Sequence, residues 1–206
     1  MRRIAIALTI TGTMLLGAAS AHAATLSSSG GIIFYVADQG ERNDVLVDTG
    51  TLLGGSVPTY TFKDADANPI TAIDPCQVID GIGMCRQEFV TSMIVNVRDR
   101  DDTAQVSDTI GIGVLMIGGR GIDVLMGGNG NDILKGNDGR DSLRGRGGAD
   151  VYKGGRGRDT LQTLDGRRDV FISCGDGSGD VLRKDRIDPR GHHCEFSNHK
   201  NPSKPH

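Results

Sequence analysis

The chain has 206 residues, 31 of them glycine, and only 4% are aromatic, with no tryptophan. Its 26 acidic and 23 basic residues nearly balance, so the formal net charge is only −3. This composition excludes one large core of aromatic and aliphatic side chains, and it argues against a protein that binds nucleic acid. It favours a stack of short repeated units, each of which contacts only its neighbours.

The first 23 residues have the pattern of an export signal. Met1-Arg2-Arg3 is a positively charged start, an apolar run from Ile4 to Gly17 follows, and Ala21-His22-Ala23 has the small-x-small pattern of a cleavage site. A retained membrane anchor is the alternative, but the apolar run is short for a span. We therefore predict a signal peptide over residues 1–23, no membrane span after processing, and a secreted, extracellular chain that starts at Ala24.

Residues 24–110 are predicted to form an N-terminal β-rich region. Short runs rich in β-branched and aromatic residues, separated by Gly, Asp and Pro clusters, are typical of all-β structure. These runs are Ile32–Ala37, Val45–Val47, Thr59–Phe62 and Phe89–Val97.

Residues 118–162 are five consecutive copies of one nine-residue unit: GGRGIDVLM, GGNGNDILK, GNDGRDSLR, GRGGADVYK and GGRGRDTLQ. The first and fourth positions of every copy are Gly. The sixth position is always an aspartate, namely Asp123, Asp132, Asp141, Asp150 and Asp159. The eighth position is always apolar, namely Leu125, Leu134, Leu143, Tyr152 and Leu161.

This pattern suits a turn followed by a very short strand. Glycine permits a sharp turn whose carbonyls point inward, and the aspartate adds a charged oxygen, so the turn offers the ligands that Ca²⁺ requires. Turn and strand make half a coil, which places turns on the same side two units apart. A cation would then bridge Asp123 with Asp141, Asp132 with Asp150, and Asp141 with Asp159.

The core of such a coil is thin. Val124, Ile133 and Val151 are expected to join the five eighth-position residues inside. The burial of so few apolar side chains provides less free energy than the loss of conformational entropy of a glycine-rich backbone costs. Without cations we expect this stretch to be largely unfolded.

The repeat resembles the RTX, or haemolysin-type, calcium-binding nonapeptide, G-G-x-G-x-D-x-U-x. The resemblance implies an all-β fold, a parallel β-roll or β-solenoid that we place over residues 111–162, with Ca²⁺ as its cofactor. For a single G-x-D an Asx-turn without metal is the better interpretation, but five copies in register favour metal binding. The candidate ligands are the five repeat aspartates, the third-position residues Asn129 and Asp138, and Asp169 and Asp180, which continue the pattern at irregular spacing.

The repeat departs from the family pattern in its charge. Residues 118–162 contain six Asp but eight Arg or Lys; Arg120 and Arg156 stand at third positions, and Arg146 replaces a second-position glycine. These cations oppose Ca²⁺ entry, so we expect a modest affinity, roughly 10⁻⁴ to 10⁻³ M as in other extracellular modules.

The N-terminal half resembles, more loosely, the leading segments of small secreted bacterial proteins of this repeat class. GERNDVLV at residues 40–47 and the segment Asp99–Thr103 look like degenerate copies of the repeat. The half is interpreted as a short-stranded β cap that shields the end of the roll from edge pairing.

Residues 163–195 resemble the closing segment of the same family and are predicted as a degenerate-repeat cap at the C-terminal end. The histidines here and in the tail are interpreted as solvated, and residues 196–206 as a disordered tail. Four cysteines in an exported chain suggest two disulfides, and three pairings are possible. We favour Cys76 with Cys85 and Cys174 with Cys194, because each pair closes a local loop and the repeat separates the two pairs; zinc binding is the alternative.

Catalytic motifs such as H-E-x-x-H, G-x-S-x-G and the P-loop do not occur in the sequence, so we expect no enzyme. The favoured function is a secreted calcium-binding protein with a structural or adhesive role, whose partners are calcium ions and a cell-surface polysaccharide or protein. A small secreted hydrolase carrying an RTX module is one alternative. A solenoid that binds polyanions through arginines in the repeat turns is the other.

Overall fold

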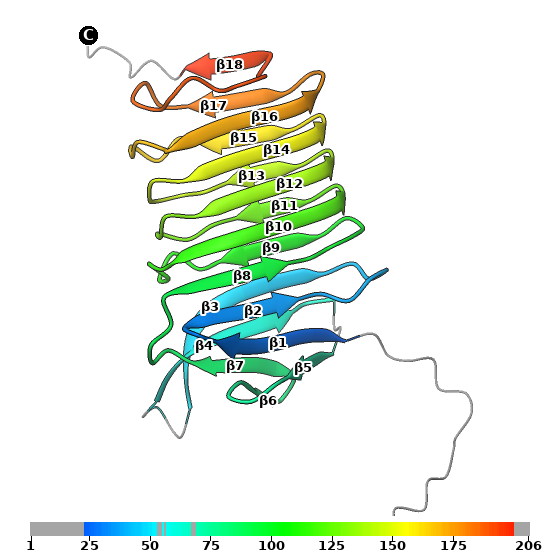
Figure 1. Cartoon of the computed structure of the whole chain (residues 1–206), viewed down its shortest axis with the longest axis vertical. Coiled ribbons are helices and arrows are strands. Elements are labelled where there is room, and N and C mark those ends of the chain that lie inside the picture. The colour runs from blue at the N-terminus through cyan, green and yellow to red at the C-terminus, as the bar shows by residue number, and fades with distance from the viewer. Residues whose placement is uncertain (1–22, 53–54, 56, 67–68, 200–206) are drawn as a thin grey trace, which may run out of the picture.

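The computed structural model describes residues 23–52, 55, 57–66 and 69–199, and every named element in this part of the chain is a β-strand. The strands stack into two sheets that face each other across a narrow core (Figure 1). The first sheet contains, in spatial order, β16 (Phe171–Gly177), β14 (Val151–Gly157), β12 (Ile133–Gly139), β10 (Gly113–Gly121), β8 (Ser92–Asn96), β2 (Ile32–Val36), β1 (Ala24–Ser29) and β5 (Ile70–Ala72). The second sheet contains β18 (Phe196–His199), β17 (Val181–Lys184), β15 (Thr160–Thr163), β13 (Ser142–Arg144), β11 (Val124–Met126), β9 (Thr103–Val106), β3 (Asp44–Leu52), β4 (Val57–Asp64), β7 (Ile82–Arg86) and β6 (Gln77–Ile79).

The repeat winds as a parallel β-solenoid with two nonapeptides in each coil, which confirms the predicted fold. Leu115 pairs with Ile133 and Ile133 with Val151 in the first sheet, while Val124 pairs with Ser142 in the second. The sequence therefore advances by 18 residues from one coil to the next, as it does between the aspartates. Above the repeat the spacing between equivalent aspartates lengthens to 19 and 21 residues, but the strands stay parallel.

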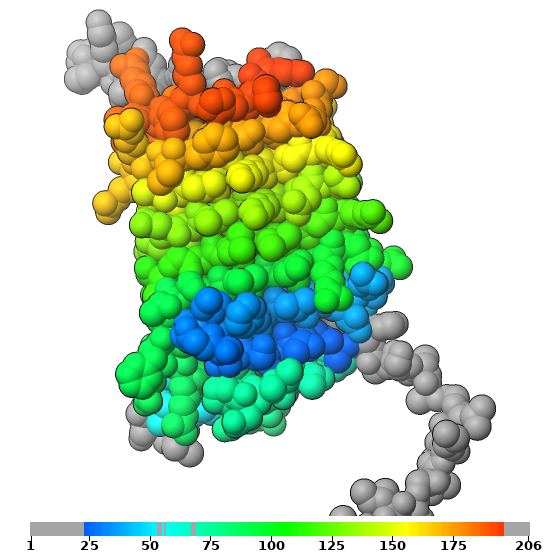
Figure 2. All heavy atoms as spheres, in the orientation of Figure 1, coloured from blue at the N-terminus to red at the C-terminus, as the bar shows by residue number. Residues whose placement is uncertain are grey.

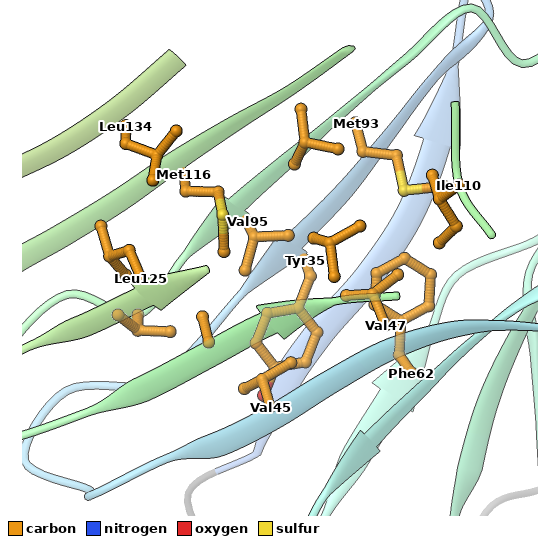
Figure 3. Packing of buried hydrophobic residues seen from close by; sticks show 14 of the residues in the cluster. Tyr35, Val45, Val47, Phe62, Met93, Val95, Ile110, Met116, Leu125 and Leu134 are labelled. Carbon is orange, nitrogen blue, oxygen red and sulfur yellow. The ribbon is translucent and has the colours of Figure 1, made fainter. Parts of the chain in front are cut away.

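The core lies between the sheets, and each repeat contributes its eighth-position side chain to it. The five eighth-position residues of the repeat are all 0% exposed, and Figure 3 shows Leu125 and Leu134 inside the stack beside Met116. The expectation that Val124, Ile133 and Val151 also point inward was wrong: Ile133 is 38% exposed, and the two valines are only half-buried. Side chains alternate along a strand, so an inward eighth position turns the seventh and ninth positions outward.

The N-terminal region forms the first coils of the same stack and a cap beneath them. Asp44 pairs with Thr103 and Thr103 with Val124, so both degenerate copies lie in register with the repeat. The chain leaves the stack after β3 and forms β4, β7 and β6, which pair antiparallel, before β8 returns above β2. The cap also buries the stacked rings of Tyr35 and Phe62, whose centroids lie 6.0 Å apart (Figure 3).

Two disulfides join the expected partners, Cys76 with Cys85 in the cap and Cys174 with Cys194 at the last coils. The final described strand, β18, pairs in parallel with β17, although it lies where we expected the disordered tail to begin. The rest of that tail, residues 200–206, and the signal peptide up to residue 22 lie outside the described residues. Among those described, no helix is long and apolar enough to cross a membrane. From β8 to β18 successive coils lie on one another in chain order, as the bands from green to red in Figure 2 show.

Candidate metal centre

Each turn from the first sheet to the second ends in a carboxylate that caps the coil before it. Oδ1 of Asp141 accepts a hydrogen bond from the backbone N–H of Asp123 at 2.9 Å, and Oδ1 of Asp159 accepts one from Asp141 at the same distance. Equivalent bonds join the whole edge, which we call the first ladder: Asn43, Asp102, Asp123, Asp141, Asp159 and Asp180.

The turns from the second sheet back to the first build a matching second ladder. Oδ1 of Asp132 accepts from the N–H of Val114, and Oδ1 of Asp150 accepts from Asp132, both at 2.8 Å. The second ladder consists of Val114, Asp132, Asp150, Asp169 and Asp188. All the aspartates of both ladders are buried, at most 6% exposed.

The second carboxylate oxygen, Oδ2, distinguishes the two ladders. In the first ladder the Oδ2 atom of every aspartate is buried and has no hydrogen-bond partner among the described residues; these are Asp102, Asp123, Asp141, Asp159 and Asp180. In the second ladder Oδ2 of Asp132 accepts from the N–H of Gly128 at 2.8 Å, and Oδ2 of Asp150 from the hydroxyl of Tyr152 at 3.3 Å. Asp169 is the second-ladder residue whose Oδ2 also lacks such a partner there.

The buried carboxylates carry charge that the protein does not neutralise. Burial, followed by repulsion from Asp141 and Asp102, raises the pKa of Asp123 to about 7. Burial also raises the pKa of Asp141 to about 6, and burial with repulsion from Asp141 and Asp180 raises that of Asp159 to about 7. Loss of hydration thus raises these pKa values more than the backbone hydrogen bonds at Oδ1 lower them. A cation beside Oδ2 would lower the pKa values again by stabilising the charged carboxylates.

The first glycine of each repeat faces these oxygens. A methyl group on Gly118 would collide with Oδ2 of Asp123 and would lie 2.9 Å from the carbonyl oxygen of Gly136, one coil above. A methyl group on Gly136 would meet Oδ2 of Asp141 and, at 2.6 Å, the carbonyl oxygen of Gly154. We call this arrangement of a first-position glycine, its own aspartate and the carbonyl above it a cradle. Glycine is required there because any side chain would displace both oxygens.

These donors fit a hard divalent cation. Carboxylate and carbonyl oxygens on a flexible turn are the ligand set of Ca²⁺, whereas nitrogen or sulfur donors would be expected for zinc. In the part of the chain that the structure describes, no three Asp, Glu, His or Cys side chains converge as a metal site. A calcium ion between two coils would therefore take backbone carbonyls together with the aspartates.

The two third-position candidates are not members of either ladder, although, beside burial, the charge of Asp138 contributes to the raised pKa of Asp141. Asn129 is exposed, and its side-chain amide donates to the carbonyl of Asp108 at 2.6 Å. Asp138 lies on the outer side of β12, where its carboxylate is 3.6 Å from the guanidinium of Arg156. Both side chains therefore contact protein groups at the surface, whereas Asp169 and Asp180, the candidates beyond the repeat, do lie in the ladders.

Sequence reasoning did not select three ladder residues outside the repeat: Asn43, Asp102 and Asp188. The degenerate copies GERNDVLV and Asp99–Thr103 contained the first two, but their distances from the repeat do not follow the nine-residue period. Once β3, β9 and β11 are aligned, Asn43 and Asp102 occupy the sixth position of a repeat. A search for the motif of a polar residue before a short strand, with variable spacing, could have found them.

We predict that Gly136→Ala weakens cation binding at least about tenfold, because its methyl group enters the cradle of Asp141. Gly111→Ala is the matched control, since a methyl group there meets nothing within 4 Å. Calorimetric titration with Ca²⁺ measures both variants. Equal affinities for the two variants would contradict the role of the cradle in cation binding.

We predict that the ion-free chain loses stability as the pH rises. The pKa values of Asp123, Asp150 and Asp159 are raised to about 7, 8 and 7, above the unfolded value of about 3.9. Protons therefore bind more tightly to the folded chain; the stability is fully present below about pH 4 and is lost as the pH rises through about 7 to 8.

Circular dichroism in metal-free buffer at pH 5 and pH 8 tests this pH dependence, and more β structure is expected at pH 5. With saturating Ca²⁺ the order should reverse, because protons compete with the ion for the carboxylates. A metal-free chain that is more stable at pH 8 would show that the carboxylates are neutralised in some other way.

Comparison with known families identifies the stretch that carries the ladders. A model of the RTX calcium-binding nonapeptide repeat, in four copies, matches residues 117–152, 126–161 and 144–167. No curated protein and no solved structure matches the chain. The match covers the repeat and leaves the cap and the last coils outside it. Residues 117–167 are RTX calcium-binding nonapeptide repeats, and they wind as a β-solenoid.

Proposed function

We propose that this chain is an exported calcium-binding solenoid, wound by the ions it binds, with a structural or adhesive role outside the cell. The observation that carries the proposal is the row of buried Oδ2 atoms in the first ladder, each without a hydrogen-bond donor among the described residues. Unpaired buried charge is among the costliest features a fold can contain. Calcium ions beside these oxygens would neutralise the buried charge and hold adjacent coils together.

The proposed ion sites lie between successive coils, so binding and folding are coupled. Asp123 and Asp141 with the carbonyls of Gly136 and Gly154 would hold ions that join one coil to the next. An unfolded chain does not bring these groups together, so the free energy of ion binding becomes free energy of folding. Affinity in the range of roughly 10⁻⁴ to 10⁻³ M suits an extracellular module.

Three features support export. The N-terminal 23 residues have the charged, apolar and small-x-small pattern of a cleaved leader. Ala24, the first residue after the predicted cleavage site, is fully buried and begins β1. The two disulfides are typical of an oxidising compartment.

The outer face of the first sheet supports binding of a polysaccharide. A hollow there is lined by Gln39, Asn96, Arg98, Asp99, Arg120, Asn137 and Asp138. A second hollow shares Asn137 and Asp138 and adds Lys153, Phe171 and His193. Amide, carboxylate and guanidinium groups beside an aromatic ring offer the donors, acceptors and apolar surface that sugar rings contact. The repeat arginines are less suited to polyanions, because Arg146 and Arg158 already bind Asp108 and the carbonyl of Gly179.

Titration of the chelated, disulfide-bonded mature chain with Ca²⁺ tests the calcium-dependent winding. We expect little β structure by circular dichroism in chelator and a cooperative gain of β signal on addition of Ca²⁺. Mg²⁺ at the same concentration should be much less effective, because it demands a rigid octahedral site. An unchanged spectrum in chelator would contradict ion-driven winding.

Retention on insoluble cell-wall polysaccharide tests the adhesive role. We expect retention with Ca²⁺, loss in chelator, and a several-fold reduction for Arg120→Ala, which removes a group that lines the hollow. Arg144→Ala is the matched control, because Arg144 lies on β13 in the opposite sheet. Equal retention of both variants would place the contact elsewhere.

A further inference from the structure

Only some turns combine a cradle with an Oδ2 that lacks a protein donor in the described structure. In the first ladder these turns are those of Asp123, Asp141 and Asp159, whose first-position glycines are Gly118, Gly136 and Gly154. We propose that calcium ions bind in single file along this one edge, at these three sites, and that the consensus turns of the second ladder are closed by the protein itself. The proposal rests on calcium binding and adds which aspartates take part.

The fourth repeat carries its own substitute for an ion. Tyr152 stands where the other four repeats have leucine, and its hydroxyl accepts from the N–H of Gly145 at 3.0 Å and donates to Oδ2 of Asp150 at 3.3 Å. A methyl group on Gly145 would meet Oδ2 of Asp150 and this hydroxyl, where the other cradles present a carbonyl oxygen. The phenol therefore occupies the cradle of Asp150.

The second repeat is closed in a different way. Both oxygens of Asp132 accept backbone hydrogen bonds, Oδ1 from Val114 and Oδ2 from Gly128, each at 2.8 Å. A carboxylate with two such donors is stabilised in its charged form without a metal. A bound ion would therefore stabilise the charged carboxylate of Asp132 less than that of Asp123.

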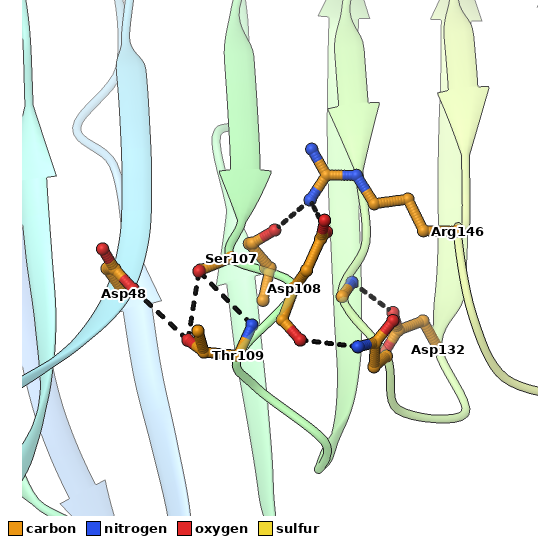
Figure 4. Close-up of polar contacts among 9 residues, drawn as sticks. Asp48, Ser107, Asp108, Thr109, Asp132 and Arg146 are labelled. Atoms are coloured by element: carbon orange, nitrogen blue, oxygen red, sulfur yellow. Dashed lines mark hydrogen bonds and ion pairs between the residues drawn. The ribbon is translucent and has the colours of Figure 1, made fainter.

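Arg146 adds a positive charge to the same edge. Its guanidinium donates to the carbonyl of Val106 at 2.6 Å and to the carboxylate of Asp108 at 2.7 Å, and the arginine side chain is only 17% exposed. Figure 4 shows this side chain reaching from its own turn to that of Asp108, in the region where Asp132 lies. A cation that belongs to the protein thus spans turns of the second ladder and would repel a calcium ion.

The ladder aspartates outside the repeat lack the first-position glycine that a cradle requires. Oδ2 of Asp102, Asp169 and Asp180 is unpaired within the described residues, but register places Val97, Thr163 and Cys174 at their first positions. All three of these residues are buried and carry a side chain where a cradle needs none. The third site still uses one of them, because the carbonyl of Cys174 closes the cradle of Asp159.

A matched pair of variants separates the two edges. Asp141→Asn and Asp150→Asn change the same repeat position in adjacent turns, and each asparagine retains an acceptor for the bond from the coil below. We expect three ions on the native chain by native mass spectrometry, three on the Asp150→Asn variant with affinity unchanged, and two or fewer on the Asp141→Asn variant. Loss of an ion from Asp150→Asn, or four or more ions on the native chain, would overturn the single-file arrangement.

Tyr152→Leu provides a second measurement that does not remove a carboxylate. It supplies the residue of the other four repeats, so a fourth ion should bind at Asp150, with circular dichroism confirming an intact fold. A folded variant that still binds three ions would show that the phenol does not close this turn. If the native chain binds no calcium at all, the proposed function fails, and not the choice between edges.

Discussion

The structure depends on how buried carboxylates are satisfied. Each ladder aspartate uses one oxygen to cap the coil before it, a bond of 2.7 to 3.1 Å that repeats along both edges. The other oxygen decides whether the turn needs an ion. Where the protein supplies a donor, the turn is complete; where it does not, and a first-position glycine leaves the cradle open, a cation can balance the desolvated charge.

Glycine makes this geometry possible through close approach as much as through backbone freedom. Gly119 and Gly121 have φ of 123° and 130°, and a methyl group on either would run into the carbonyls of Arg98 and Arg100 in the coil below. The core between the two sheets is thin, since each repeat buries one apolar eighth-position side chain such as Leu143 or Tyr152. Such a core buries little apolar surface for each ordered residue, which is why the edges contribute so much to holding the stack together.

The sequence predicted the parallel solenoid, the 18-residue coil and both disulfides, because each follows from a spacing or a pairing that is visible in one dimension. It could not show that the two edges differ. Tyr152 fits the apolar eighth position as leucine does, and its hydroxyl matters only after folding carries it to Gly145 and Asp150. Asp102 and Asp188 were missed because insertions between coils break the nine-residue period, although the strands remain in register. Ile133 is apolar, but it precedes the inward eighth position by one residue, so the alternation of a strand turns it outward.

The antiparallel strands of the cap, β4, β7 and β6, contribute no residue to either ladder. Other interactions stabilise the cap. Cys76–Cys85, the stacked rings of Tyr35 and Phe62, and the pairing of β3 with β4 are all independent of bound ions. In a linear array of units, the slowest event is the formation of the first ordered unit, and every later one adds to a ready surface. An ordered base of this kind offers the first coil of the stack a surface to pack on, whether or not ions are bound.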